Sequence, residues 1–267
     1  MIIIGEKINS TLKAVRPAIA AYDTEAIQKL AKMQTEAGSS YIDLNAGMFY
    51  EDEAQRLVWL IDTVQAVVKT PLCLDSPSAA VLKAGLKACK GDVPIINSIT
   101  AEKDRFNSIM PLALEYKTKI IALCMDDNGM PETGEERYII AKHLIKDLTS
   151  SGMKQGDIFI DPLVRPVSTG AHYGLAAIET IRRVKTEYPD VHIACGLSNV
   201  SFGLPQRKLI NQTFLVSAMA AGMDGAILDP MDNKLMAFVA ASEAVLGIDE
   251  FCIEYIAKSR EGLFDGI

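Results

Sequence analysis

Long apolar runs and clusters of basic residues are both missing from this sequence of 267 residues. No stretch approaches the roughly 18 apolar residues of a membrane span. The apolar start Met1–Ile4 is followed at once by Gly5-Glu6-Lys7, which leaves it too short for a signal peptide. Acidic residues outnumber basic ones by 34 to 27, and the formal charge is −7, so neither nucleic acid nor a membrane is an expected partner. We predict a soluble, cytoplasmic protein.

Cysteines are few: the chain has five, widely spaced and without a C-x-x-C pair. Structural disulfides are not expected in a cytoplasmic protein, and three of the cysteines lie in apolar runs, where a free thiol packs as a small apolar group. A zinc site from Cys73, Cys124 and Cys195 is the alternative, but the local ligand spacing that zinc sites favour is absent. We predict no bound metal.

Two kinds of segment alternate along the chain, in which 49% of the residues are hydrophobic. Short β-branched or apolar runs predict strands at Ile2–Ile4, Tyr41–Leu44, Leu72–Leu74, Pro94–Ile96, Lys119–Leu123, Asp157–Ile160, Val191–Cys195 and Gly225–Leu228. Longer amphipathic stretches predict helices from Asp23 to Gly38 and at Glu51–Lys69, Ala79–Ala88, Lys103–Lys117, Glu135–Ser150, Leu175–Thr186, Arg207–Ala221 and Lys234–Leu246.

Eight strands, each followed by a helix, predict a (β/α)8 TIM barrel, which typically takes about 250 residues. A doubly wound open sheet is the alternative, but the G-x-G-x-x-G turn that such sheets use for dinucleotides follows none of the strands. We expect a single domain over residues 1–267. Within it, residues 249–267 are expected to add one more amphipathic helix, as a cap or a dimer contact.

Polar residues follow every predicted strand, and Asp or Asn occurs at all eight strand ends. The segments are Gly5-Glu6-Lys7-Ile8-Asn9, Asp43-Leu44-Asn45, Leu74-Asp75-Ser76, Asn97-Ser98, Met125-Asp126, Asp161-Pro162, Gly196-Leu197-Ser198-Asn199 and Leu228-Asp229. Barrel enzymes carry their chemistry at these ends. Helix capping explains any single Asp or Asn, but Ser, Thr and Gly also serve as caps, so the repetition indicates a common binding site.

Carboxylates and amides in one ring suit a flat, nitrogen-rich heterocycle. The edge of a pterin presents an exocyclic amine beside a ring N–H, and one carboxylate can accept from both donors. The pterin carbonyl and remaining ring nitrogens suit Asn, which both donates and accepts. A phosphate site would instead need Lys, Arg or glycine-rich backbone donors. The strand ends therefore predict a pterin or purine pocket.

These segments also resemble, in order, those of the pterin-binding methyltransferases. The matching segments are Gly5-Glu6-Lys7-Ile8-Asn9, Asp43-Leu44-Asn45, Cys73-Leu74-Asp75-Ser76, Ile96-Asn97-Ser98, Ile160-Asp161-Pro162-Leu163 and Gly196-Leu197-Ser198-Asn199-Val200-Ser201. From about Met1 to Leu246 the chain resembles a methyltetrahydrofolate:corrinoid protein methyltransferase, a family related to the folate module of cobalamin-dependent methionine synthase.

The resemblance implies a reaction and a set of site residues. The N5 methyl group of 5-methyltetrahydrofolate would pass to cobalt(I) of a corrinoid (cobalamin) on a partner protein, or the reverse, in a homodimer whose folate site holds no metal. The residues implied to bind the folate or lie near the bound cofactors are Asp75, Asn97, Asp161, Gly196, Ser198 and Arg207, and we add Glu6 and Asn9 from the first strand. Asn199 matches the residue that bonds to N5. Phe202, as in methionine-synthase-like members, is expected on the rim that faces the corrinoid.

Methyl transfer from N5 requires positive charge on that nitrogen, because a nitrogen anion is a very poor leaving group. Asn199 cannot supply the proton, since an amide does not give one up at accessible pH. Our hypothesis is that Asn199 stabilises protonated N5 while the proton arrives through water. The alternative acid is Asp75 or Asp161, with its pKa raised by burial.

Two other functions compete with methyl transfer. A dihydropteroate-synthase-like enzyme would share the barrel and the pterin site, but that family carries an Arg-x-His pair at strand eight, where this chain has Asp229-Pro230-Met231-Asp232. A non-catalytic folate-binding subunit of a corrinoid complex is the second alternative. The chain has no Asp-x-His-x-x-Gly segment of the corrinoid-binding kind, so cobalt must arrive on a partner or as free cofactor.

Overall fold

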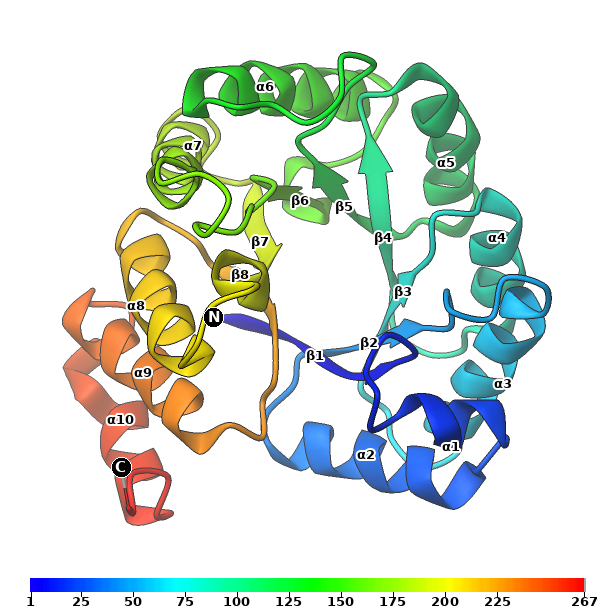
Figure 1. The fold of residues 1–267 in the computed structure, drawn as a ribbon, viewed down its shortest axis with the longest axis horizontal. Coiled ribbons are helices and arrows are strands. Elements are labelled where there is room, and N and C mark those ends of the chain that lie inside the picture. Colours follow the sequence, from blue (N-terminus) through cyan, green and yellow to red (C-terminus); the bar gives the residue numbers. More distant parts are fainter. Residues whose placement is uncertain (267) are drawn as a thin grey trace.

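The computed structural model describes residues 1–266, and eight parallel strands close into a barrel in the order β1 to β8. The strands are β1 (Ile2–Asn9), β2 (Tyr41–Asn45), β3 (Leu72–Asp75), β4 (Ile95–Thr100), β5 (Lys119–Leu123), β6 (Ile158–Asp161), β7 (His192–Gly196) and β8 (Gly225–Leu228). Helices surround this barrel on the outside (Figure 1). The predicted (β/α)8 architecture is confirmed.

The outer ring consists of the predicted helices and a few short additions. The α-helices are α1 (Arg16–Ala20), α2 (Thr24–Glu36), α3 (Glu53–Gln65), α4 (Ala79–Ala88), α5 (Lys103–Tyr116), α6 (Gly134–Ser150), α7 (Tyr173–Glu187), α8 (Arg207–Ala220), α9 (Asn233–Val245) and α10 (Ile253–Arg260). Short 3-10 turns are η1 (Gln155–Asp157), η2 (Leu197–Ser201) and η3 (Glu250–Cys252). Asp23 caps the start of α2, because its carboxylate accepts from the Ala26 amide at 3.0 Å. Helix α1 and the 3-10 turns were not predicted.

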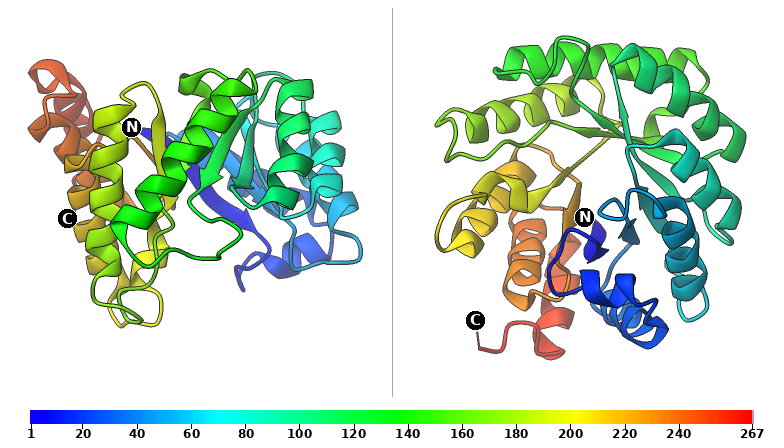
Figure 2. Two further views of the ribbon diagram at one scale, coloured as in Figure 1. Left: turned by 90° about the horizontal axis from the view of Figure 1, so that it is seen from above. Right: turned by 45° about the vertical axis from the view of Figure 1, so that its right-hand side comes forward.

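The C-terminal segment lies on the outside of the ring. Helix α10 packs beside α9 (Figure 1), and two further views place it at the outer edge of the molecule (Figure 2). Lys258 Nζ on α10 is 4.0 Å from Glu243 Oε2 on α9. The segment expected as one helix is therefore a 3-10 turn followed by α10, and Ile267 lies outside the described residues. Its use as a cap or a dimer contact stays a prediction.

The barrel interior is apolar in its middle and polar toward the carboxyl ends of the strands. Residues Ile4, Cys73, Ile95, Ile121, Phe159 and Ala194 form a buried cluster inside the barrel. Side chains alternate along a strand, so the next inward position lies two residues further on. Those positions are Glu6, Asp75, Asn97, Leu123, Asp161 and Gly196. The polar layer thus rests on a packed apolar floor at the carboxyl ends of the strands.

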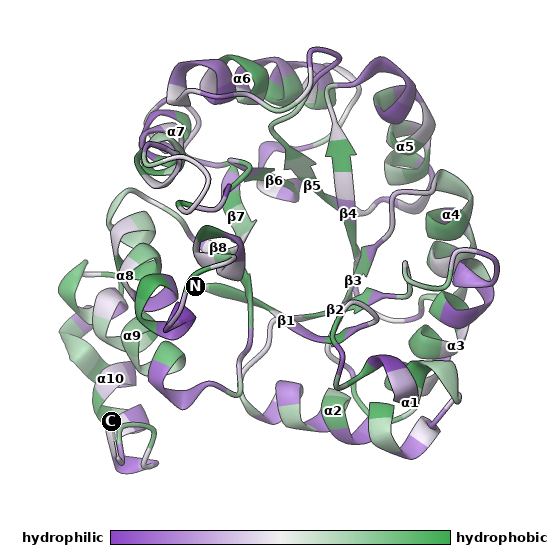
Figure 3. Ribbon diagram, in the orientation of Figure 1, coloured by the Kyte–Doolittle hydropathy of each residue, from purple (hydrophilic) through white to green (hydrophobic). Residues whose placement is uncertain are grey.

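A second, larger cluster joins the outward faces of the strands to the helices. The strands are largely hydrophobic, whereas hydrophilic residues lie mostly on the outer helices and loops (Figure 3). Among residues 1–266, no helix combines the length and the apolar character needed to cross a bilayer.

Candidate active site

A cavity of about 450 Å³ opens at the carboxyl ends of the strands. Each of the eight strands contributes an inward-facing residue to the wall of this cavity. These residues are Glu6, Asp43, Asp75, Asn97, Leu123, Asp161, Gly196 and Ile227. Two further strand residues, Asn9 of β1 and Ser98 of β4, also line the cavity. The connecting segments complete the lining with Thr11, Leu12, Leu163, Ser198 and Asn199. The wall is rich in carboxyl and amide groups and contains no Lys, Arg or His.

Most residues predicted for the site meet in this cavity. Asp75, Asn97, Asp161, Gly196, Ser198, Asn199, Glu6 and Asn9 all contribute to its lining. Arg207 lies behind the wall instead: its Nη2 donates to the Ser198 carbonyl at 2.6 Å, and its Nε donates to Ser201 Oγ at 3.0 Å. Phe202 is outside the cavity with 65% of its surface exposed. The binding roles given to these residues stay predictions.

Asp43 belongs to one of the polar segments at the strand ends, but it was not predicted as a site residue. Its signal was strand alternation: Asp43 follows the inward Tyr41 by two residues, and the inward Asn45 follows it by two more. Asp43 was missed because site residues were expected at or after the strand ends, whereas Asp43 lies within β2. Strand β1 likewise continues to Asn9 rather than ending at Ile4, so Glu6 and Asn9 lie within a strand.

Hydrogen bonds hold the acidic wall on strands β2 to β4. The Asn45 amide donates to Asp75 Oδ2 at 2.9 Å, and the Asn97 amide donates to Asp43 Oδ1 at 3.3 Å. Asn45 is itself oriented by Ser10 Oγ, which donates to Asn45 Oδ1 at 2.8 Å. Two amides, one on β2 and one on β4, thereby orient two carboxyl groups that would otherwise repel each other.

Asp161 is held from the backbone. Its Oδ1 accepts from the Leu163 amide at 2.8 Å. Burial raises the pKa of Asp161 from 3.8 to about 7, and hydrogen bonds from the Leu163 and Gly196 amides oppose that rise. An unprotonated Asp161 would therefore be a strong acceptor for a ligand that brings its own N–H donors.

The other carboxyl groups of the wall also hold their protons unusually well. Burial is the main cause for each of them, and it raises the pKa of Glu6 to about 7, with the charge of Asp229 adding to the effect. Burial and then the nearby Asp75 raise the pKa of Asp43 well above its ordinary value. Burial also raises the pKa of Asp75. Such groups release protons readily when a donor-rich or cationic ligand enters.

Asp161 also predicts how stability depends on pH. The unfolded chain ionises this group near 3.8, while the folded chain keeps the proton to about 7. The folded state therefore binds more protons between these values, and the free energy of unfolding should fall as the pH rises through that window. The slope for one such group is about 1.4 kcal/mol per pH unit. Glu6 acts in the same direction.

Urea unfolding at pH 5 and pH 8 measures this effect. The Asp161→Asn variant should lose part of the difference, because it has no proton to release, and should gain stability relative to wild type at pH 8. Asp190→Asn, at an exposed surface position, should leave the difference as it is. Equal pH dependence in wild type and Asp161→Asn would contradict the prediction.

Asn199 lies on η2, directly after β7, and lines the cavity. A methyl group added at Gly196 would stand 3.0 Å from Asn199 Nδ2, so the amide lies over the end of β7 because residue 196 has no side chain. Within residues 1–266 the Asn199 amide makes no side-chain hydrogen bond, and it is solvent-exposed. It is therefore available to a ligand.

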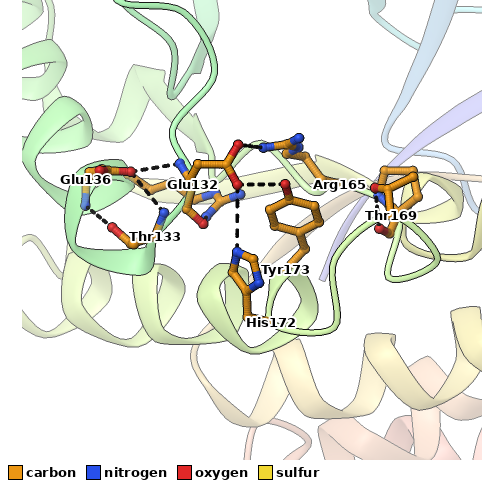
Figure 4. A network of polar contacts seen from close by, with 9 residues as sticks. Glu132, Thr133, Glu136, Arg165, Thr169, His172 and Tyr173 are labelled. Atoms are coloured by element: carbon orange, nitrogen blue, oxygen red, sulfur yellow. Dashed lines mark hydrogen bonds and ion pairs between the residues drawn. The ribbon is translucent and has the colours of Figure 1, made fainter.

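Glu132, just before α6, makes a network of polar contacts with the loop between β6 and α7 (Figure 4). Glu132 accepts from Arg165 Nη1 at 2.6 Å and from the Tyr173 hydroxyl at 2.7 Å, with His172 Nε2 at 3.8 Å. Further along the same loop, the Val167 amide donates to the Val200 carbonyl at 3.0 Å. The loop is thus tied to Glu132 near both of its ends and to η2 between them.

Across residues 1–266, no three His, Cys, Asp or Glu side chains are grouped so that they could hold a metal ion. The five cysteines are free, and burial raises the pKa of the thiols of Cys73, Cys124 and Cys195.

Comparison of the sequence with known proteins places this chain in a family. Residues 6–229 match the family model described as pterin binding enzyme. The methylcorrinoid:tetrahydrofolate methyltransferase of Eubacterium limosum is 40% identical over 98% of this chain and 97% of its own length. The methionine synthase of Mycobacterium tuberculosis is 34% identical over 85% of this chain, which corresponds to only 20% of that larger protein.

Solved structures agree on the fold. A dihydropteroate synthase from Vibrio fischeri superposes with a TM-score of 0.70 at 15% identity, covering 92% of this chain and 93% of that one. A dihydropteroate synthase from Yersinia pestis gives a TM-score of 0.68 at 14% identity over 92% of this chain and 94% of its own. These likenesses show the barrel alone. From the sequence matches, the chain belongs to the pterin-binding enzyme family, among the relatives of the Eubacterium limosum methylcorrinoid:tetrahydrofolate methyltransferase.

Proposed function

We propose that this protein transfers a methyl group between the cobalt of a corrinoid, carried on a partner protein, and N5 of tetrahydrofolate. The observation that carries the proposal is a relative named for this reaction, 40% identical along almost the whole of both chains. Its name makes the methylcorrinoid the donor and tetrahydrofolate the acceptor. We propose the same direction here. It is the second of the two directions that the resemblance implied, with the methyl group passing from the corrinoid to the folate.

The wall of the cavity supports this substrate. The guanidine-like edge of the pterin, with its amine and ring N–H, fits the Asp161 carboxylate, and Asp75 and Asn97 line the same cavity for the rest of the ring. Ligand donors would replace the hydration that burial removes from these groups. Gly196 and Ser198 bring the backbone close to the same space.

Asn199 is proposed to act at the reacting nitrogen. The N5 lone pair attacks the methyl carbon, the cobalt–carbon bond breaks with both electrons staying on cobalt, and N5 carries a positive charge until its proton leaves. The Asn199 side-chain oxygen can accept the N5 proton in a hydrogen bond while that charge is present. A preorganised dipole of this kind contributes about 2.7–4 kcal/mol, judged from single oxyanion-hole donors.

The cavity lining argues against one of the two alternatives. A dihydropteroate synthase must bind a diphosphate, and the lining holds four carboxyl groups and no cation. A subunit that only binds folate is distinguished by assay, because it would form neither product. We further propose a cytoplasmic homodimer, with a corrinoid protein docking at the mouth near Phe202.

A direct assay tests the proposed function. Purified chain is mixed with tetrahydrofolate and methylated free cobalamin, and cobalt(I) absorption is followed under anaerobic conditions, with 5-methyltetrahydrofolate measured as the second product. We expect both products to form together, at a rate proportional to protein concentration. Formation no faster than in the protein-free mixture would contradict the proposal.

Gly196→Ala offers a more local check. The added methyl group would push the Asn199 amide aside by a few tenths of an ångström, and misplacement by about 1 Å can cost a hundredfold in rate. We expect methyl transfer to slow by about tenfold, with a smaller loss of tetrahydrofolate affinity. Gly156→Ala is the matched control, because a methyl group there meets nothing closer than 4.0 Å. An unaltered rate in Gly196→Ala would show that the amide position is unimportant.

A further inference from the structure

Glu6 stands between the main cavity and a second, smaller one. This side chamber has a volume of about 170 Å³ and lies beyond β1 and β8, against helix α8. Glu6 and Ser198 line both spaces. The chamber has room for several water molecules, each of which takes about 30 Å³ in the liquid. The Glu6 carboxyl is therefore placed to exchange a proton with either space.

Glu6 differs from the other carboxyl groups of the cavity in having no partner. Asp43 accepts from Asn97, Asp75 accepts from Asn45, and Asp161 accepts from the backbone. Within residues 1–266 the Glu6 carboxyl makes no hydrogen bond. It also adjoins the turn that carries Asn199, since Ser198 of that turn lines both spaces with it.

The side chamber contains a polar atom that needs water. Asn211 on α8 lines the chamber, and its Oδ1 is buried without a hydrogen-bond partner among the described residues. Buried acceptors of this kind bond to ordered water when no protein donor is near. The chamber also reaches solvent, because Lys208, 78% exposed, lines it and pairs with Asp232 at 2.9 Å.

We propose that Glu6 is the base that takes the proton from N5 as the methyl group is transferred to that nitrogen, and that water in the side chamber carries this proton to solvent. The proposal rests on the proposed function. In the step, the N5–H bond breaks, its electron pair stays on nitrogen, and a Glu6 oxygen gains the proton. Neutral 5-methyltetrahydrofolate and cobalt(I) remain, and Glu6 then returns the proton to water. In the opposite direction Glu6 would protonate N5 before the methyl group leaves.

The charges around Glu6 suit a group that exchanges protons near neutral pH. Burial and then Asp229 raise its pKa to about 7, while Lys7 and Arg207 act to lower it. Lys7 Nζ pairs with Asp229 Oδ2 at 2.9 Å, so these two largely offset each other. The charge of Glu6 in turn helps to raise the pKa of Asp43. General acid–base groups work best with a pKa near the operating pH.

The test compares wild type with Glu6→Gln in single-turnover methyl transfer to saturating tetrahydrofolate, between about pH 5.5 and 8.5. Saturating tetrahydrofolate keeps the folate site filled at each pH. The titration of Asp161, which affects binding, therefore does not enter the measured rate. The wild-type rate should rise with pH and level off above about 7, since the carboxylate is the active form. Glu6→Gln should be about a hundredfold slower, without that inflection, and calorimetry should show a much smaller change in the affinity for tetrahydrofolate. Glu25→Gln, on the surface of α2, is the control.

A second variant examines the water path. Asn211→Leu should slow the same step while keeping the inflection and the tetrahydrofolate affinity, because it removes the acceptor that holds water in the chamber. A wild-type rate and pH profile in Glu6→Gln would overturn the assignment, as would equal losses of rate and affinity. If wild type itself transfers no methyl group, the proposed function fails and the assignment fails with it.

Discussion

Replacing Asn199 with alanine is expected to slow methyl transfer at least about a hundredfold, as the loss of one preorganised dipole at a developing charge does. The amide lines the cavity and has no other hydrogen-bond partner among the described side chains. Its interaction should be strongest when N5 is both methylated and protonated, so the transition state loses more than the bound substrate does. Tetrahydrofolate affinity should therefore change much less than the rate.

Single-turnover rates and calorimetry, carried out on the same preparations, separate the two effects. Asn128→Ala is a suitable control, because Asn128 is an exposed loop amide outside the cavity. If Asn199→Ala loses affinity and rate in equal measure, Asn199 only binds the folate. If neither changes, the amide does not contact the reacting nitrogen.

The second large effect is expected at Asp161. Asp161→Asn places an amide where the pterin edge needs an acceptor for two donors, and hydrogen bonds to a charged group contribute about 1.5–3 kcal/mol. We expect tetrahydrofolate to bind about a hundredfold more weakly, which corresponds to about 2.7 kcal/mol. The rate at saturating tetrahydrofolate should fall much less, because the pterin edge lies across the ring system from N5.

The same variant tests the protonation of Asp161. Its pKa of about 7 in the free protein means that the binding form, the carboxylate, is scarce at low pH. Wild-type affinity should rise about tenfold per pH unit below 7 and level off above it, whereas Asp161→Asn should show no such rise. Asp190→Asn, on the surface, should behave as wild type. A rate loss with unchanged binding would instead make Asp161 the group that exchanges the N5 proton.

Much of this site could be located from the order of residues in the chain. Parallel strands all point the same way in a barrel, so the residues at their carboxyl ends must meet at one face. This places Asp75, Asn97, Asp161 and Asn199 together without knowledge of any distance. The recurrence of Asp and Asn at those ends also predicted a ligand rich in hydrogen-bond donors.

Two residues show where that reasoning stopped. Asp43 was passed over because it precedes the end of its strand, and only strand alternation in the closed barrel shows that it points inward. Arg207 was expected near the ligands, and the structure places its guanidinium on the Ser198 carbonyl and the Ser201 hydroxyl, outside the cavity lining, so its role there stays a prediction. The path of a long side chain depends on neighbours that are remote in sequence, so spacing does not predict it.

The sequence by itself determined the number and order of strands, the (β/α)8 fold and the polar character of the mouth, because these follow from local periodicity and composition. Only the tertiary structure decided which carboxyl groups have partners, how far burial raises their pKa values, and that Glu6 separates two cavities. Those properties depend on distances and on exclusion of water, which arise only when all eight strands close around one axis.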